Sequence, residues 1–142
     1  MSIEDEVRNA SNQFYEALNK MVNGNPQALQ DIWVHDSAVS TMHPIGGRQV
    51  GWKDVWETWD KTAQVASDGQ VTLNDQFIRV VGDMAYEIGV ENAGFRIAGE
   101  KATDQVRVTN IYQKEGGTWK IVHHHTDISP AMVEVLHKLQ NA

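Results

Sequence analysis

Three consecutive histidines, His123, His124 and His125, are the side chains of this sequence whose type and spacing most readily point to chemistry. Successive side chains of a strand point to opposite faces, so His123 and His125 would share one face and His124 would take the other. One ion therefore cannot bind all three. A pair spaced by two residues is only half of a metal site, and the chain has no cysteine and no His-x-x-Glu-type motif to complete it. We expect no metal.

His124 remains a candidate for proton transfer, because a neutral imidazole near its intrinsic pKa can serve as general acid or base. The alternative is a hydrogen-bonded residue in the wall of a pocket. On the preceding strand, the period of two places Val108, Asn110 and Tyr112 on one face. Asn110 offers both a donor and an acceptor, either to a ligand or to a neighbour in the sheet.

Aromatic side chains form a second group. Trp52, Trp56 and Trp59 lie at helical spacing and share one face of a predicted helix. Such a stripe can pack in a core or offer flat apolar surface to a ligand, and the sequence leaves both alternatives open. His43, at the end of a predicted strand, is either a second acid or base or a histidine packed on tryptophan.

Length and charge restrict the classes of function. The chain of 142 residues suits one domain, residues 1–142, and its 12 Lys and Arg against 19 Asp and Glu give a net charge of -7. The basic residues are not gathered into a stripe, so we expect neither a nucleic acid nor a membrane as partner. Residues 1–8 lack the apolar core of a signal peptide, which makes the cytoplasm the expected location.

The periodicity of apolar residues changes once along the chain. A helical period predicts helices over residues 3–21, with Ser2 as N-cap, from Asn25-Pro26 through Trp33, and over residues 52–63. Residues 38–43 read as a strand that ends at Pro44 and a turn around Gly46-Gly47. A period of two then predicts strands over residues 71–81, 84–97, 103–114 and 118–128, before a last helix after Ser129-Pro130.

Helices followed by a long antiparallel sheet indicate the α+β class, with the helices covering one face of the sheet. Strands of this length exceed the usual five or six residues and must curl. A curled sheet closed by helices leaves a concave hollow, where we expect an apolar pocket.

Several motifs resemble the nuclear transport factor 2-like superfamily. They are the strand end His43-Pro44, the Gly51-Trp52 start of a helix and the run Trp119-Lys120-Ile121-Val122-His123-His124-His125. Within the superfamily the chain is most similar to the SnoaL-like group, and the last run also resembles the association domain of calmodulin-dependent kinase II. The resemblance implies a cone-shaped α+β barrel, N-terminal helices on the concave face of a curved, mostly antiparallel sheet, a short C-terminal helix and a homodimer through the outer sheet face.

The resemblance also implies which residues face the pocket. By the association-domain pattern, Val122, His124 and Thr126 look inward, Asn110 and Val108 join them, and His123 and His125 lie on the outer face with Asp127. His43 would lie near the pocket floor beside Trp52 and Trp56. Tyr15 resembles the oxyanion-stabilising tyrosine of ketosteroid isomerase. The matched strand positions carry the neutral residues Ile88 and Val90 in place of that enzyme's acidic pair, which argues against steroid isomerisation.

Two hypotheses of function follow. In the first, a small, mostly apolar substrate, polycyclic or carbonyl-bearing, undergoes cofactor-free acid-base chemistry of the isomerase, cyclase or dehydratase type. The catalytic residues would be His124 and Tyr15, and the ligand-binding residues would be His43, Trp52, Trp56, Val108, Asn110 and Thr126. In the second, the chain is a non-catalytic module that binds a ligand or dimerises.

Overall fold

Within residues 1–141, six strands form one sheet in the order β2-β1-β6-β5-β4-β3, in which only the β1 and β6 pair is parallel. The computed structural model describes residues 1–141. Its elements are α1 (Ile3–Met21), α2 (Leu29–Ile32), β1 (Ser40–His43), β2 (Gly46–Val50), α3 (Trp52–Val65), β3 (Ala66–Val81), β4 (Met84–Ile97), β5 (Glu100–Glu115), β6 (Thr118–Thr126) and α4 (Pro130–Gln140). The expected α+β class, with helices on one face of a mostly antiparallel sheet, is confirmed.

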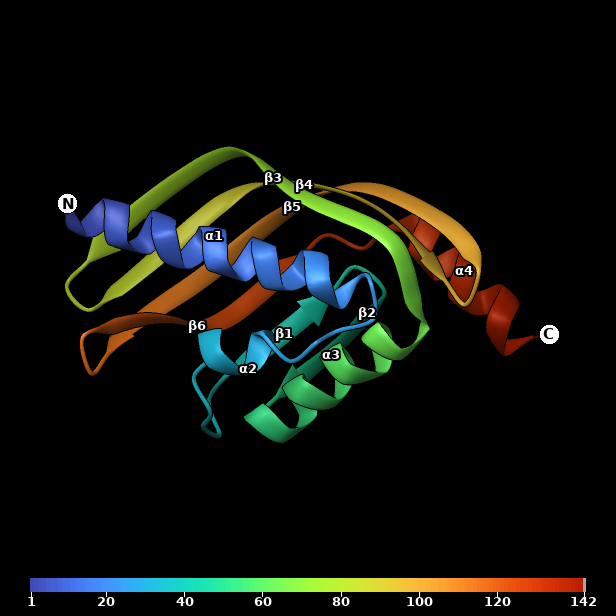
Figure 1. The fold of residues 1–142 in the computed structure, drawn as a ribbon, viewed down its shortest axis with the longest axis horizontal. Coiled ribbons are helices and arrows are strands. Elements are labelled where there is room, and N and C mark those ends of the chain that lie inside the picture. Colours follow the sequence, from blue (N-terminus) through green and yellow to red (C-terminus); the bar gives the residue numbers. More distant parts are fainter. Residues whose placement is uncertain (142) are drawn as a thin grey trace.

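The sheet is curved, and its long strands bend around α1 (Figure 1). Strands β3, β4 and β5 have 16, 14 and 16 residues. Register shifts in β3, between Ser67 and Gln70 and between Asn74 and Phe77, add local bends to the ordinary twist of such strands. The helix α1 lies along the concave face, while α3 and α4 cover the end of the sheet farther from the N-terminus (Figure 1).

The helix ends follow from local chemistry. The Ser2 hydroxyl accepts a hydrogen bond from the backbone N–H of Asp5 at 3.1 Å, and the Asp5 carboxylate accepts one from the Ser2 backbone at 3.2 Å, which makes a reciprocal N-terminal cap. Gly51, with φ of 92°, allows the sharp entry into α3. Ser129 caps α4 by accepting from the Met132 backbone, and Pro130 occupies the first turn as expected.

Several local expectations were wrong. Strand β3 begins at Ala66 rather than at residue 71, and β6 ends at Thr126 rather than at residue 128. The short second helix begins at Leu29 rather than at Pro26, because residues 26–28 form only a turn. The segment expected as a turn at Gly46-Gly47 begins strand β2, which pairs with β1 at the edge of the sheet. An edge strand that starts with two glycines and stays half-exposed lacks the apolar alternation that marks a strand in a sequence.

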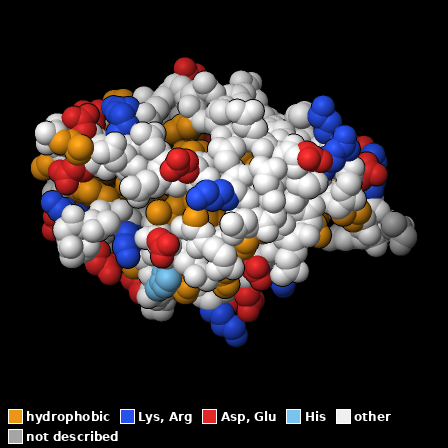
Figure 2. Space-filling view, in the orientation of Figure 1, with side chains coloured by type: hydrophobic (Ala, Val, Ile, Leu, Met, Phe, Trp, Pro, Cys, Tyr) orange, Lys and Arg blue, Asp and Glu red, His pale blue; other side chains and the backbone are white. Residues whose placement is uncertain are grey.

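The apolar core lies between the concave face and the helices. Its largest fully buried side chains include Trp33, Phe14 and Tyr112, and Phe14 packs edge-on against Trp33 and Trp59 with ring centroids 6.4 and 6.3 Å apart. On the face drawn in Figure 2, basic and acidic side chains are intermingled among small apolar patches. Within residues 1–141, no helix combines the length and apolarity that crossing a membrane requires.

Candidate functional site

A small cavity of about 60 Å³ lies between the concave face of the sheet and the helices. Its wall is mostly apolar, yet four ionisable side chains reach it: His43, Glu91, Asp104 and His124. The other lining residues are Leu18, Met21, Val22, Pro44, Ile45, Trp59, Thr62, Val71, Ala93, Phe95 and Met132. Ionisable groups in such surroundings cannot be hydrated as they are in water, so their charge states shift.

Glu91 is the most unusual of these groups. Its side chain projects from β4, the residue is 5 % exposed, and burial raises the pKa of its carboxyl to about 7. Asp104 and Glu87 add to this increase, and the hydrogen bond from Tyr15 offsets part of it. That bond, from the Tyr15 hydroxyl to Glu91 Oε2 at 2.8 Å, ties the carboxyl to α1. Glu91 can therefore gain or lose a proton near neutral pH.

His124 lies beside Glu91 at the cavity wall. Its Nε2 is 3.9 Å from Glu91 Oε2, and its Nδ1 is 2.6 Å from the Asn110 side-chain oxygen. The residue is 2 % exposed, and burial lowers the pKa of its imidazole well below the usual value, with further lowering from His43. The ring is consequently neutral near pH 7 and is a poor proton carrier by itself.

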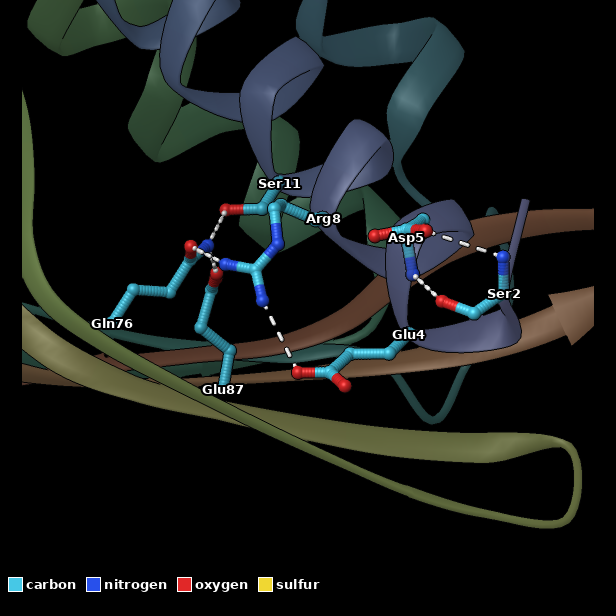
Figure 3. Close-up of polar contacts among 7 residues, drawn as sticks. All are labelled: Ser2, Glu4, Asp5, Arg8, Ser11, Gln76 and Glu87. Carbon is cyan, nitrogen blue, oxygen red and sulfur yellow. Dashed lines mark hydrogen bonds and ion pairs between the residues drawn. The ribbon is translucent and has the colours of Figure 1, made fainter.

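Glu87, four residues before Glu91 on the same face of β4, accepts three hydrogen bonds. Its Oε1 accepts from the Asn110 amide at 3.0 Å and from the Tyr112 hydroxyl at 2.8 Å, and its Oε2 accepts from the Gln76 amide at 2.6 Å. Figure 3 shows Gln76 reaching Glu87 and Ser11, with the Arg8 guanidinium donating to Gln76. A polar chain thus runs from the surface cation through Glu87 to the cavity.

His43 and Asp104 complete the ionisable wall. The His43 Nε2 donates to the Thr58 hydroxyl at 2.9 Å, since that hydroxyl gives its own hydrogen to the Val55 carbonyl, and burial lowers the pKa of the ring to about 4. Burial raises the pKa of Asp104 to about 6, partly offset by the Ser129 side chain and the Ala93 backbone. Neither neighbour is aligned as a regular hydrogen bond, so within residues 1–141 both buried oxygens of Asp104 lack a partner.

The structure brings some of the expected site residues together. His43 and His124 line the cavity, while Tyr15 and Asn110 lie behind its wall and reach it through their bonds to Glu91 and His124. Asn110 also donates to the Tyr15 hydroxyl at 3.1 Å. The expected inward orientation of His124 and Asn110 agrees with their exposures of 2 % and 0 %.

Trp52 and Trp56, expected beside the pocket, do not line this cavity. The cavity is lined by Trp59, against which the His43 ring packs edge-on at 4.4 Å. Trp52 starts the same helix about two turns earlier, roughly 10 Å along its axis, and stacks on the exposed His35 with ring centroids 4.1 Å apart. Trp56 packs beside Trp52 rather than toward the cavity.

Val108 and Thr126 face inward and are buried, but they do not line the cavity. Val122 is only half-buried. Ile121 takes the inward position that was expected for Val122. The reason is a register shift between β5 and β6, which interrupts the alternation before His124. On the outer face, the His123 ring contacts the Ser40 hydroxyl at 2.7 Å, and Asp127 binds Arg107 at 2.8 Å instead of a histidine.

Glu87, Glu91 and Asp104 were missed in the sequence. Ile88 and Val90 were expected at the acidic positions of this strand, but Ile88 is 42 % exposed on the outer face, and the inward face belongs to Glu87 and Glu91. The available signal was that both acids share the parity of Ala85 and Phe95. Among residues 1–141, no three His, Asp or Glu side chains gather in a way that could hold a metal ion.

Residues 7–132 match the family model described as a SnoaL-like domain. The chain belongs to the SnoaL-like family. Among solved structures, this SnoaL-like chain is similar to a candidate dehydratase of the NTF2-like family from Streptomyces avermitilis, with a TM-score of 0.79 and 24 % identity over 90 % of this chain and 96 % of the other. It is also similar to the CaMKII hub of S. rosetta, with a TM-score of 0.72 and 19 % identity over 91 % and 98 % of the two chains.

A curated relative is the F-box protein SKIP8 of Arabidopsis thaliana, which is 22 % identical over 107 residues. This alignment covers 72 % of the SnoaL-like chain but only 42 % of the relative, so the chain spans less than half of that protein. Identities this low establish the NTF2-like, cystatin-like fold of these neighbours and leave the activity to be argued from the site.

Proposed function

We propose that the cavity binds a small apolar molecule with a carbonyl group and that Glu91 exchanges a proton with it, without a cofactor. The observation that carries this proposal is a carboxyl 5 % exposed, among apolar walls, whose pKa is raised to about 7. A general acid or base works best when its pKa lies near the working pH. Glu91 meets that condition, whereas the lowered pKa of His124 does not.

The neighbouring groups then take supporting roles. His124, neutral and 3.9 Å from Glu91, offers a hydrogen-bond acceptor or a second base beside the carboxyl. Tyr15 already gives its hydrogen to Glu91, so it orients the carboxyl instead of stabilising an oxyanion as first expected. An acid and a base side by side suit proton removal next to a carbonyl, or loss of water, which is the class of reaction in the name of the S. avermitilis neighbour.

The cavity limits the substrate. A volume of about 60 Å³ is far below the 300–1,000 Å³ typical of pockets for drug-sized ligands. A polycyclic molecule therefore does not fit this conformation, and we propose substrates of a few heavy atoms, such as short ketones and aldehydes.

Exchange of carbon-bound hydrogen for deuterium tests this proposal directly. We expect the protein in heavy water to accelerate exchange next to the carbonyl of at least one member of a panel of short ketones and aldehydes, followed by proton NMR. Glu91→Gln should lower the rate by about 100-fold or more, because it removes the proton-transfer group and keeps its shape. Glu91→Asp should recover part of the rate.

The control is His137→Asn, which changes an exposed residue of α4. If Glu91→Gln exchanged substrate hydrogen as fast as the unmodified protein, Glu91 would not be the proton-transfer group. A rate that fails to change between pH 6 and 8 would contradict the proposal too, since a group with a pKa of about 7 must titrate in that range.

We also propose that the outer sheet face mediates self-association. An apolar patch lies there on β3 and β4, formed by Phe77, Val81, Met84, Tyr86 and Ile88, each 37 to 60 % exposed. Their cross-strand pairing, with Phe77 opposite Ile88 and Val81 opposite Met84, makes the patch continuous. Contiguous exposed apolar surface of this kind marks interaction sites, and the S. rosetta neighbour is named as a hub.

Ile88→Asp should convert a homodimer into a monomer, because it places a charge within the apolar patch that a dimer would bury. Sedimentation velocity at micromolar concentration should give twice the chain mass of 15.9 kDa for the unmodified protein and the single mass for the variant. Ile3→Asp, at an apolar residue of α1 that is also exposed, should remain dimeric. A monomer mass for the unmodified protein would rule the homodimer out.

A further inference from the structure

In each hydrogen bond between Glu87 and the cavity, the chemistry of the two side chains fixes which one donates and which one accepts. Glu87 is fully buried and accepts at both oxygens, from Gln76, Tyr112 and Asn110. The Gln76 amide is itself oriented, because its oxygen accepts from the Arg8 guanidinium, which has donors only. Its NH₂ group must therefore face Glu87, as Figure 3 shows.

The same reasoning fixes the Asn110 amide. Its NH₂ group donates to Glu87 Oε1 at 3.0 Å and to the Tyr15 hydroxyl at 3.1 Å. Turning this amide over would place its carbonyl oxygen against the Glu87 carboxylate, where two acceptors repel each other. The Asn110 oxygen consequently faces His124 Nδ1 at 2.6 Å, and that nitrogen must carry a hydrogen to form the bond.

The donor and acceptor roles of Tyr15 are fixed in the same way. Its oxygen receives the Asn110 amide hydrogen, so its own hydrogen goes to Glu91 Oε2 at 2.8 Å. In neutral His124 only one nitrogen carries hydrogen, which leaves Nε2 with a free lone pair 3.9 Å from Glu91 Oε2.

We propose that Glu87, acting through the Asn110 amide, holds His124 in the Nδ1–H tautomer and so keeps a bare Nε2 beside Glu91 at the cavity. Glu87 is then a positioning residue that touches no ligand. The free Nε2 selects ligands that offer it an O–H, N–H or acidic C–H, while Glu91 contacts the same ligand with its carboxyl. This second statement rests on the proposed function, but the tautomer does not.

Nitrogen NMR tests the tautomer in the free protein, without any ligand. In protein labelled with ¹⁵N-histidine, long-range proton-nitrogen spectra at neutral pH should show His124 with a protonated Nδ1 and an unprotonated, downfield Nε2. His124→Asn assigns the signals. A His124 spectrum with hydrogen on Nε2 would overturn the proposal.

Two variants separate positioning from general structure. Glu87→Met removes the anion, frees the Asn110 amide to turn over, and should move the Nε2 signal upfield toward the protonated position. Tyr112→Phe removes another donor to the same Glu87 oxygen but leaves the Asn110 contact, so its His124 spectrum should match the unmodified protein. An unchanged spectrum in folded Glu87→Met would overturn the role of Glu87.

If Glu87→Met does not fold, Asn110→Val removes the connecting amide instead, and the same upfield movement is expected. An unchanged spectrum in Asn110→Val would exclude the connection. Failure of deuterium exchange with every carbonyl compound leaves these signals untouched, so the tautomer and the proposed function can fail separately.

Discussion

Replacing Glu91 with Gln is expected to stabilise the fold by about 3 kcal/mol above about pH 8 and to leave its stability unchanged near pH 4. The carboxyl has a pKa of 4.5 when unfolded and about 7 when folded, so the folded protein holds this proton more tightly. Stability from this group is complete below pH 4.5 and is lost as the pH rises through 7. A glutamine cannot ionise, and its oxygen can still accept from Tyr15.

Urea unfolding of both proteins at several pH values measures this difference. The gap between the midpoints should open between pH 4.5 and 8, and the dependence on denaturant should stay the same. Glu57→Gln, at an exposed site of α3, serves as the control and should show no such gap. Equal stability of Glu91→Gln and the unmodified protein at high pH would mean that the folded carboxyl titrates normally.

His43→Gln is expected to show the opposite pH dependence. Burial lowers the pKa of His43 from 6.5 to about 4, so protonation favours the unfolded chain, and this group costs the unmodified protein about 3 kcal/mol on going from pH 7 to pH 4. The stability contributed by the neutral ring is complete above pH 6.5 and is lost as the pH falls toward 4. The variant should be spared this loss.

Thermal or urea unfolding between pH 4 and 7.5 measures it, with the variant compared with the unmodified protein at each pH. The comparison isolates His43, because Glu91 and Asp104 titrate in both proteins. His137→Gln, at an exposed residue, should retain the full acid sensitivity. If His43→Gln and the unmodified protein lost the same stability on acidification, His43 would not be buried as a neutral ring.

These two titrations describe one property of the cavity. Burial raises the pKa of its carboxyls Glu91 and Asp104 and lowers the pKa of its histidines, because both shifts disfavour charge in an apolar wall. Glu87 is the carboxyl that accepts three hydrogen bonds, and Arg8 lies at the surface end of this hydrogen-bond network. Glu91, by contrast, lies at the cavity wall, where it can change charge when a ligand enters.

The periodicity of apolar residues predicted most elements of the fold. The alternating pattern of residues 84–97 matched β4 to the residue, and the caps at Ser2 and Ser129 were found because they depend only on neighbours in the chain. The edge strand β2 was missed, since its glycines carry no apolar alternation.

The site was harder to predict, because it depends on parity and on contacts between distant segments. On β4 the inward positions were expected at Ile88 and Val90, one residue away from the buried Glu87 and Glu91. The register shift between β5 and β6 places Ile121 in the inward position expected for Val122. The choice of Trp59 over Trp52 needed the position of α3 along the sheet. His124 and Asn110 were found because their strands keep the period of two where they pair.

The proposed proton exchange depends on a buried Glu91 carboxyl that titrates near neutral pH. Carbon NMR of the side-chain carboxyl, in protein labelled with ¹³C-glutamate and assigned with Glu91→Gln, measures that titration directly. We expect a midpoint at about pH 7 for Glu91. A midpoint near the ordinary glutamate value of 4.5 would contradict it.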